Sequence, residues 1–186
     1  MPEAEAAFLS AAYDAAGVIL EYGAGGSTVM ASEIAGTSVW AVESDKRFLR
    51  ELQAYFDGAP PKATVHLHHA NIGPTGKWGA PQDDSKWRRW KSYPLGVWDL
   101  DGFQQPDVVL IDGRFRAACF LAVAFRTKAP VEVYWDDYAE RERYHEVERL
   151  VKPVEMVGRM ARFEVEPMQP QGADLAWIMD VFGRKQ

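Results

Sequence analysis

The sequence predicts a single α/β domain: a doubly wound, mostly parallel sheet of seven strands, with helices on both faces and an antiparallel strand hairpin near the C-terminus. Three observations lead to this fold class. Short apolar runs alternate with helix-length segments as far as residue 151, and strand-like runs dominate the remainder. Residues 107–111 are almost wholly apolar, as in a strand buried on both faces of a parallel sheet. A glycine-rich turn joins the first strand to the next helix.

The first half of the chain predicts three helices and three strands. Residues 3–16 are rich in alanine and place Phe8, Ala12 and Tyr13 at helical spacing, and Gly17 ends this helix. The next elements, in order, are a strand at residues 18–22, a helix ending near Gly36, a strand at 38–42, a helix at 45–56 and a strand at 64–68. The helix at 45–56 is expected to place five aromatic and aliphatic side chains on one face: Phe48, Leu49, Leu52, Tyr55 and Phe56.

The second half begins with a segment of little periodicity, at about residues 73–105, which we interpret as an insertion into the domain. Regular elements then return. They are a strand at residues 107–111, a helix at 115–127, a strand at 131–134, a charged helix at 139–151, and two or three strands, near 154–157, 162–165 and 176–182. Residues 1–186 are therefore expected to form one domain.

Composition excludes several classes of protein. Hydrophobic residues make up 47% and charged residues 26%, which is typical of a globular protein. The net charge of -6 disfavours non-specific binding to nucleic acid or to anionic membranes. The single cysteine, Cys119, excludes a disulfide or thiolate-metal framework. Because no apolar stretch is long enough to span a bilayer and the first residues are acidic, we expect a cytoplasmic protein.

The most informative segment runs from Glu21 to Thr28 with the sequence EYGAGGST. Gly23 and Gly25 let a ligand approach the backbone where the strand enters the helix. Glu43 ends the next strand, where a carboxylate can accept hydrogen bonds from both hydroxyls of a ribose. The carboxylate of Glu21 would repel a pyrophosphate but attract the ammonium and sulfonium of S-adenosylmethionine. The charges therefore favour the methyl donor over a nicotinamide dinucleotide, although a glycine turn that only packs strand against helix stays an alternative.

The run EYGAGGST resembles the first motif of class I S-adenosylmethionine-dependent methyltransferases, commonly E/D-x-G-x-G-x-G. The resemblance covers nearly the whole chain in element order and implies the Rossmann-like fold of that family. It also implies that Glu21 and the turn hold the methionine portion, that Glu43 holds the ribose, and that residues 70–72 flank the adenine. Asn71 stands where the family often has aspartate, and its side-chain carbonyl can accept a hydrogen bond from the adenine amino group. The candidate cofactor-binding residues are Glu21, Tyr22, Gly23, Ala24, Gly25, Ser27, Glu43, Ser44, Asn71, Ile72 and Asp112.

Asp112 follows the predicted strand at 107–111, at the edge of the sheet where open α/β folds bind their ligands. The run DVVLIDGR resembles the fourth motif of the family, in which the strand-end aspartate faces the transferable methyl. The resemblance implies that Asp112 is the catalytic or substrate-orienting residue. The sequence contains no unmistakable general base, which keeps a non-catalytic binding protein as an alternative.

A magnesium ion is a further possibility, because Asp112, Asp136 and Asp137 follow two neighbouring strands and could act as hard oxygen ligands. The run WDDY resembles the corresponding motif of family members that methylate hydroxyls with bound magnesium. Those members carry Asp-His where Arg114 and Phe115 stand here. Since a cation at Arg114 would compete for the carboxylates, we favour a salt bridge and assign no metal ligand.

The segment at about 73–105 contains four of the seven tryptophans, at positions 78, 87, 90 and 98, together with five lysines and arginines. We interpret it as a cap over the substrate side of the pocket, where aromatic faces and cations could hold a planar or acidic acceptor. A satellite core or a homo-oligomer contact is the alternative.

The sequence therefore predicts a methyltransferase that transfers the methyl group of S-adenosylmethionine to a small molecule or a protein side chain. One alternative is a non-catalytic methyltransferase-like protein that binds an adenosyl or nucleotide ligand. A nucleic-acid methyltransferase that uses the basic insertion is the other, and the net negative charge counts against it.

Overall fold

The computed structural model describes residues 1–185. Its strands form one seven-stranded sheet in the order β3-β2-β1-β4-β5-β7-β6. The first five strands along the chain are parallel, whereas β7 is antiparallel to both β5 and β6. The mixed sheet and its C-terminal hairpin confirm the predicted fold class. The strands are β1 (Val18–Tyr22), β2 (Ser38–Glu43), β3 (Thr64–His69), β4 (Val108–Ile111), β5 (Val131–Trp135), β6 (Glu155–Val157) and β7 (Met160–Val165).

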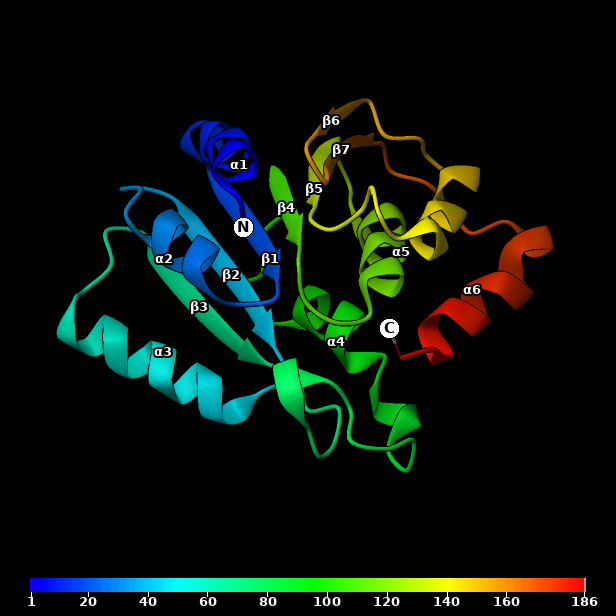
Figure 1. Cartoon of the computed structure of the whole chain (residues 1–186), viewed down its shortest axis with the longest axis horizontal. Coiled ribbons are helices and arrows are strands. Elements are labelled where there is room, and N and C mark those ends of the chain that lie inside the picture. The colour runs from blue at the N-terminus through cyan, green and yellow to red at the C-terminus, as the bar shows by residue number, and fades with distance from the viewer. Residues whose placement is uncertain (186) are drawn as a thin grey trace.

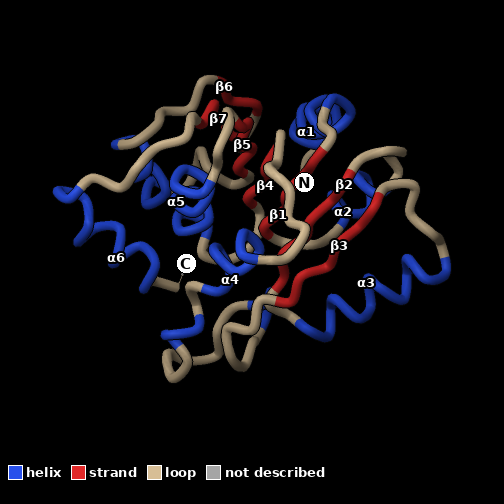
Figure 2. The backbone as a smooth tube through the Cα atoms, turned by 180° about the vertical axis from the view of Figure 1, so that it is seen from behind, coloured by secondary structure: helices blue, strands red, loops and turns tan. Residues whose placement is uncertain are grey.

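Helices cover both faces of this sheet. Helices α1, α2 and α3 lie on one face, and α4, α5 and α6 lie on the other (Figure 1; Figure 2). Their bounds are α1 (Glu3–Ala15), α2 (Gly26–Ser32), α3 (Lys46–Gly58), α4 (Ser92–Leu95), α5 (Arg116–Arg126) and α6 (Leu175–Gly183). Five short 3-10 helices complete the regular structure of residues 1–185: Lys77–Gly79, Trp87–Arg89, Gly96–Asp99, Glu142–Arg149 and Gly172–Asp174. In this part of the chain no helix is long and apolar enough to cross a membrane.

Strand β1 illustrates why both faces are covered, because its apolar side chains alternate between two buried clusters. Ile19 packs with Leu9 and Tyr13 of α1. Leu20 and Tyr22 belong to the larger cluster on the opposite face, which includes α5. A strand with apolar residues on both faces is stable only between two layers of helix, since each face must be removed from water.

Two expectations are corrected by the structure. Residues 176–182 were expected to form a strand but lie in α6, where Ile178 and Val181 are buried and Met179 is 74% exposed. This three-residue spacing of buried side chains is helical, and the apolar run covers α5 rather than extending the sheet.

In α3, Leu49 and Leu52 are buried as expected, with Phe56. Phe48 and Tyr55 are exposed, because they flank the buried stripe instead of belonging to it.

The tryptophan-rich segment divides into two parts. Trp78 is 76% exposed and Trp87 is 53% exposed, so the first part protrudes from the domain. From Trp90 onward the chain joins the core, where Trp90, Tyr93 and Val97 are buried and α4 packs against α5. The second part is thus the crossover between β3 and β4. Its helical spacing is hard to recognise in the sequence because α4 is only four residues long.

The turn after β1 packs directly against the turn after β4. Gly23 has a φ of +108°, and a Cβ atom built on it would lie 2.7 Å from the backbone nitrogen of Gly113 and 2.8 Å from its Cα. Any side chain at this position would therefore separate the two strand ends. Glycine is required here by the close approach of two backbones as well as by the positive φ.

We expect Gly23→Ala to lower the free energy of unfolding by about 2 kcal/mol or more, because the added methyl meets rigid backbone and the φ is unfavourable for alanine. Chemical denaturation would measure the loss. Gly26→Ala is the matched control: a Cβ there meets nothing within 4 Å and the residue begins α2. Equal stability of the two variants would show that the contact between the turns is not a constraint.

Candidate functional site

A cavity of about 1070 Å³ opens at the edge of the sheet where β1, β2, β4 and β5 end. Its walls come from segments far apart in the sequence, including the glycine turn, the end of β2, the turn after β4 and the N-terminal helix. The lining residues are Met1, Ala6, Gly23, Ala24, Gly25, Gly26, Ser27, Met30, Glu43, Asp45, Phe48, Trp78, Gly79, Tyr93, Asp112, Gly113, Arg114, Arg116, Asp137, Arg141 and Arg159. The cavity therefore combines most of the predicted turn with both Glu43 and Asp112.

Glu21 lies beneath the glycine turn and is fully buried, so it is not among the residues that line the cavity. Its carboxylate accepts hydrogen bonds from the Tyr13 hydroxyl, at 2.7 Å, and from the Thr28 hydroxyl. Thr28 Oγ1 in turn accepts from the backbone N–H of Gly25, at 2.9 Å. Glu21 thus fixes the shape of the turn through side chains on α1 and α2. Its predicted contact with the methionine portion stays a prediction.

Glu43 lines the cavity at the end of β2, and one of its oxygens is held by two backbone donors. Oε1 accepts from the backbone N–H groups of Ser44, at 2.6 Å, and Asp45, at 2.8 Å, and Ser44 Oγ lies 3.2 Å from it. Within residues 1–185, Oε2 makes no hydrogen bond. Burial raises the pKa of Glu43, while the two backbone N–H groups act in the opposite direction. The carboxylate is therefore oriented by its own backbone and keeps one oxygen for a ligand.

Gly79, in the protruding segment, lies against the end of β2. Its carbonyl accepts a hydrogen bond of 2.7 Å from Ser44 Oγ. Ser44 is buried, and this bond holds the segment so that Trp78, with a φ of +61°, also lines the cavity. The sequence pointed to the tryptophan-rich segment as a whole, whereas the structure brings Trp78 and Gly79 specifically to the cavity.

Five of the predicted cofactor-binding residues lie outside the cavity wall: Glu21 and Ser44, described above, and Tyr22, Asn71 and Ile72. The Tyr22 hydroxyl points into the core, where it donates to the Pro94 carbonyl at 2.6 Å and accepts from Trp98 Nε1 at 2.7 Å. Ile72 is buried in the core. Asn71 is exposed, and its Oδ1 accepts from the backbone N–H of Gly73 at 3.2 Å. Their roles toward a cofactor stay predictions.

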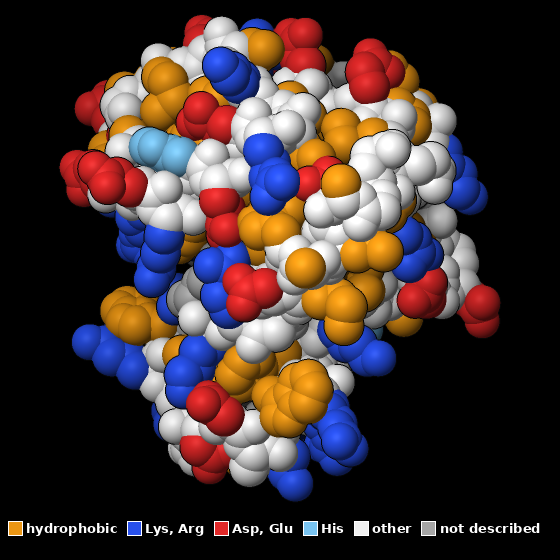
Figure 3. Space-filling view, turned by 90° about the vertical axis from the view of Figure 1, so that its right-hand side faces the viewer, with side chains coloured by type: hydrophobic (Ala, Val, Ile, Leu, Met, Phe, Trp, Pro, Cys, Tyr) orange, Lys and Arg blue, Asp and Glu red, His pale blue; other side chains and the backbone are white. Residues whose placement is uncertain are grey.

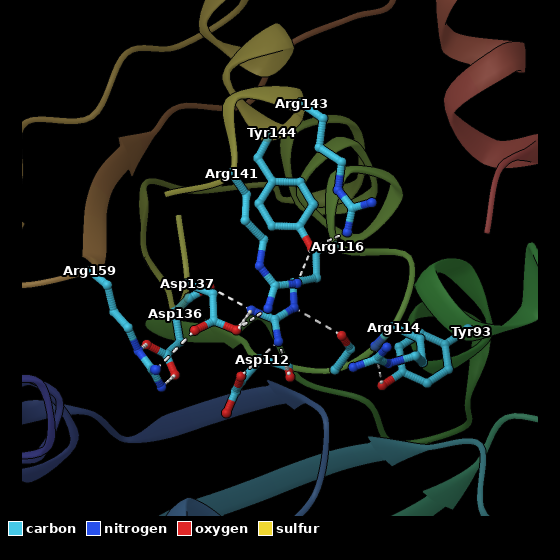
Figure 4. A network of polar contacts seen from close by, with 11 residues as sticks. Tyr93, Asp112, Arg114, Arg116, Asp136, Asp137, Arg141, Arg143, Tyr144 and Arg159 are labelled. Carbon is cyan, nitrogen blue, oxygen red and sulfur yellow. Dashed lines mark hydrogen bonds and ion pairs between the residues drawn. The ribbon is translucent and has the colours of Figure 1, made fainter. Parts of the chain in front are cut away.

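Asp112 follows β4 and contributes a carboxylate to the cavity. Its Oδ1 accepts a hydrogen bond of 3.0 Å from Arg116 Nη2, and Figure 4 shows the other oxygen pointing away from Arg116. Burial raises the pKa of Asp112, Arg116 lowers it, and Asp136 and Asp137 raise it further. One carboxylate oxygen is thus fixed by an arginine while the other is available to a ligand.

Arginines surround the three aspartates that the sequence suggested as metal ligands (Figure 4). Arg159 donates to both oxygens of Asp136, at 2.9 and 2.8 Å. Asp137 pairs with Arg141 at 2.6 Å, Arg159 at 3.1 Å and Arg116 at 3.5 Å. The expected salt bridge is therefore present, but its cations are these three arginines and not Arg114. Within residues 1–185 no group of three or more acidic, histidine or cysteine side chains is arranged to hold a metal ion.

Arg116, Arg141 and Arg159 are the residues of this network that the sequence analysis missed. Arg116 is four residues after Asp112 and begins α5, so its closeness in sequence to the strand end is a signal that could have identified it. Arg159 lies in the turn between β6 and β7, and nothing local in the sequence connects it with Asp136.

Comparisons with known proteins identify the family. A scan of protein-family models and a search of curated proteins return no match. A solved structure of a methyltransferase-like protein from Silicibacter pomeroyi is 45% identical, with a TM-score of 0.94 over 98% of this chain and 95% of that one. The chain therefore belongs to the methyltransferase-like proteins of the class I fold.

More distant structures share the fold. The O-methyltransferase TomG from Streptomyces achromogenes, solved in complex with S-adenosylmethionine, is 14% identical with a TM-score of 0.60, over 90% of this chain and 80% of that one. An O-methyltransferase from Bacillus cereus, solved with S-adenosylhomocysteine, is 12% identical with a TM-score of 0.59, over 89% and 82% of the two chains.

Glu21 makes the stability of the protein depend on pH. Burial raises its pKa from 4.5 to about 7, although the hydrogen bonds from Thr28 and Tyr13 oppose this. The folded protein therefore holds the proton more tightly than the unfolded chain does. The contribution of Glu21 to the free energy of unfolding consequently falls as the pH rises from about 4.5 to about 7.

Glu21→Gln removes this titration. We expect the free energy of unfolding of the variant, relative to wild type, to rise by up to about 3 kcal/mol between about pH 5 and pH 8. Urea denaturation at the two pH values measures the change, and Glu51→Gln on the exposed face of α3 is the control. A difference between Glu21→Gln and wild type that does not vary with pH would contradict the assignment.

Proposed function

We propose that this protein is an enzyme that transfers the methyl group of S-adenosylmethionine to an acceptor on a small molecule or a protein side chain. The observation that carries the proposal is the cavity, which brings the glycine turn, the open oxygen of Glu43 and the open oxygen of Asp112 to one site. The family supports a methyltransferase, and two distant structures of this fold were solved with the methyl donor or its product.

The residues present fit this cofactor. A Cβ built on Gly25 or Gly26 meets no atom within 4 Å, so the turn leaves open space beside the backbone. Glu43 offers a pre-oriented carboxylate at the end of β2 for the two ribose hydroxyls. The open oxygens of Glu43 and Asp112 can attract the ammonium and sulfonium of the cofactor. The exposed indole of Trp78 offers an aromatic face at the Glu43 end of the cavity.

When bound, the cofactor supplies a methyl group on a sulfonium that is already a good leaving group, so the protein mainly aligns the acceptor and removes its proton. In our proposal Asp112 performs this alignment with the oxygen that Arg116 does not hold. The burial that raises the pKa of Asp112 makes it a better proton acceptor than an exposed aspartate.

A magnesium ion has no part in the proposal. The carboxylates of Asp112, Asp136 and Asp137 are directed to guanidinium groups that already neutralise them. A divalent ion would have to displace Arg116, Arg141 and Arg159 to bind all three, and each displaced arginine would lose a charge-assisted hydrogen bond.

We expect S-adenosylhomocysteine to bind the wild-type protein in calorimetry, whereas NAD does not.

Glu43→Ala should weaken the binding of S-adenosylhomocysteine by about 1 to 3 kcal/mol, because the ribose hydroxyls lose their acceptor in a partly buried site. Glu51→Ala, on the exposed face of α3, is the control and should bind like wild type. Tighter binding of NAD than of S-adenosylhomocysteine would overturn the cofactor assignment, and an unchanged affinity of Glu43→Ala would remove Glu43 from the site.

Asp112→Asn should keep the fold and most of the affinity for S-adenosylhomocysteine but lose methyl transfer, because an amide aligns an acceptor without taking its proton. Release of S-adenosylhomocysteine during incubation with a panel of hydroxyl, amine and thiol acceptors measures activity. EDTA should leave the wild-type rate unchanged. Turnover that EDTA abolishes and Mg²⁺ restores would contradict the arginine-neutralised site. Binding without turnover of any acceptor would favour the non-catalytic alternative.

A further inference from the structure

Four arginines line the cavity around Asp112, and three of them are neutralised by aspartates. Arg116, Arg141 and Arg159 pair with Asp112, Asp136 and Asp137 as described above. Within residues 1–185 the guanidinium group of Arg114 makes no ion pair. Around Asp112, four guanidinium groups therefore meet three carboxylates, one of them the buried Asp136 behind the wall, and Arg114 is the arginine left without an ion-pair partner in this part of the chain.

Arg114 is fixed at its backbone but not at its side chain. Its N–H donates to the Tyr93 hydroxyl at 3.3 Å, and its carbonyl accepts from Cys119 Sγ at 3.4 Å. The side-chain Nε is buried and has no hydrogen-bond partner in the part of the chain that the structure describes. A buried donor without an acceptor costs free energy, and an anionic ligand that accepted its hydrogen bond would remove this cost. Figure 4 shows Arg114 beside Tyr93, with no dashed line from its guanidinium group to a carboxylate.

The protruding segment, which contributes Trp78 and Gly79 to the cavity wall, is also basic. Residues 73–91 contain Lys77, Lys86, Arg88, Arg89 and Lys91 but only two acidic residues, Asp83 and Asp84, whereas the whole chain has a net charge of -6. Figure 3 shows lysine and arginine side chains gathered on the lobe at the lower end of the molecule, the end at which Figure 1 places this segment. A local positive potential on this segment attracts anions to the part of the molecule that carries Trp78 and Gly79.

We propose that Arg114 binds an anionic group of the methyl acceptor, a carboxylate or a phosphate, which both accept paired hydrogen bonds from a guanidinium fork. This inference rests on the proposed function and specifies its substrate class. The anionic group is a recognition element and is not the methylated atom. Arg114 is two residues after Asp112, so an acceptor held at Arg114 places its reactive group within reach of the residue that aligns it.

The test uses the full chain saturated with S-adenosylhomocysteine. Benzoate and phenyl phosphate are the probes for the two anionic groups, and benzyl alcohol is the neutral control of similar shape. We expect at least one of the two anions to bind and benzyl alcohol to bind much more weakly. Arg114→Gln should weaken the binding of the anion by about tenfold or more, since a charge-assisted pair is lost. Arg114→Lys should fall in between, because it keeps the charge and loses the fork.

Arg50→Gln is the matched control, because it removes the same charge from an exposed position on α3 outside the cavity. Thermal unfolding checks that each variant is folded. If Arg114→Gln does not fold, the affinity of Arg114→Lys for the anion is compared with that of wild type instead. Anions that bind Arg114→Gln as tightly as wild type would overturn the proposal. Failure of both anions to bind the wild type would overturn it as well.

A second comparison separates the acceptor from the cofactor. S-adenosylhomocysteine has a carboxylate, whereas 5′-methylthioadenosine lacks the amino-acid portion. If Arg114→Gln weakens only the first of these two ligands, Arg114 holds the cofactor carboxylate and the proposal is wrong; equal affinities for wild type and variant support it. If S-adenosylhomocysteine does not bind the wild type at all, the proposed function fails. The anions are then titrated into the protein without S-adenosylhomocysteine, so that failure of the proposed function and failure of the Arg114 proposal remain distinct.

Discussion

The direct contact between the backbones of Gly23 and Gly113 is the constraint on which the site depends. It brings the ends of β1 and β4 together at the middle of the sheet, and no side chain fits between them. Because Gly23 begins the glycine turn and Gly113 follows Asp112, the same contact fixes the turn relative to the carboxylate. Glu21 then sets the path of the turn from below through Thr28 and Tyr13.

The three aspartates at the ends of β4 and β5 form an arrangement of carboxylates that either a bound metal ion or cationic side chains could neutralise. Three acidic groups close together repel one another, so a cation must accompany them. In this protein the cations are side chains from α5, from the segment after β5 and from the turn between β6 and β7. Arginine also imposes directional hydrogen bonds, which a bound ion would not. The arginines therefore orient the carboxylates as well as neutralising their charge.

Much of the fold followed from local patterns in the sequence. The apolar run at β4, the glycine turn after β1 and the amphipathic helix α3 each carry their own signal, and all three elements are present. The apolar run at residues 176–182 misled the prediction, because periodicity in a short run of apolar residues fits both a strand and a helix, and only packing against α5 decides between them.

The site was predictable only where its residues lie within one motif. Glu43 and Asp112 end strands, and both line the cavity. Tyr22 and Ile72 flank the right motifs, but the alternation of side chains along β1 turns Tyr22 into the core, and Ile72, in the loop after β3, is buried in the same cluster. Arg159 and Trp78 enter the cavity wall from a hairpin turn and a protruding segment, and their positions depend on tertiary packing that no local pattern encodes.

The hydrogen bond of 3.1 Å from the backbone N–H of Arg159 to Glu5 joins two residues that are 154 positions apart. Arg159 also holds Asp136, so the far wall of the cavity is anchored on the first helix of the chain. A chain emerging from the ribosome can pair β1, β2 and β3 early, but this wall must wait until the β6–β7 turn has been synthesised. Its formation is thus a late, long-range event in folding, with the loop-closure cost that such contacts carry.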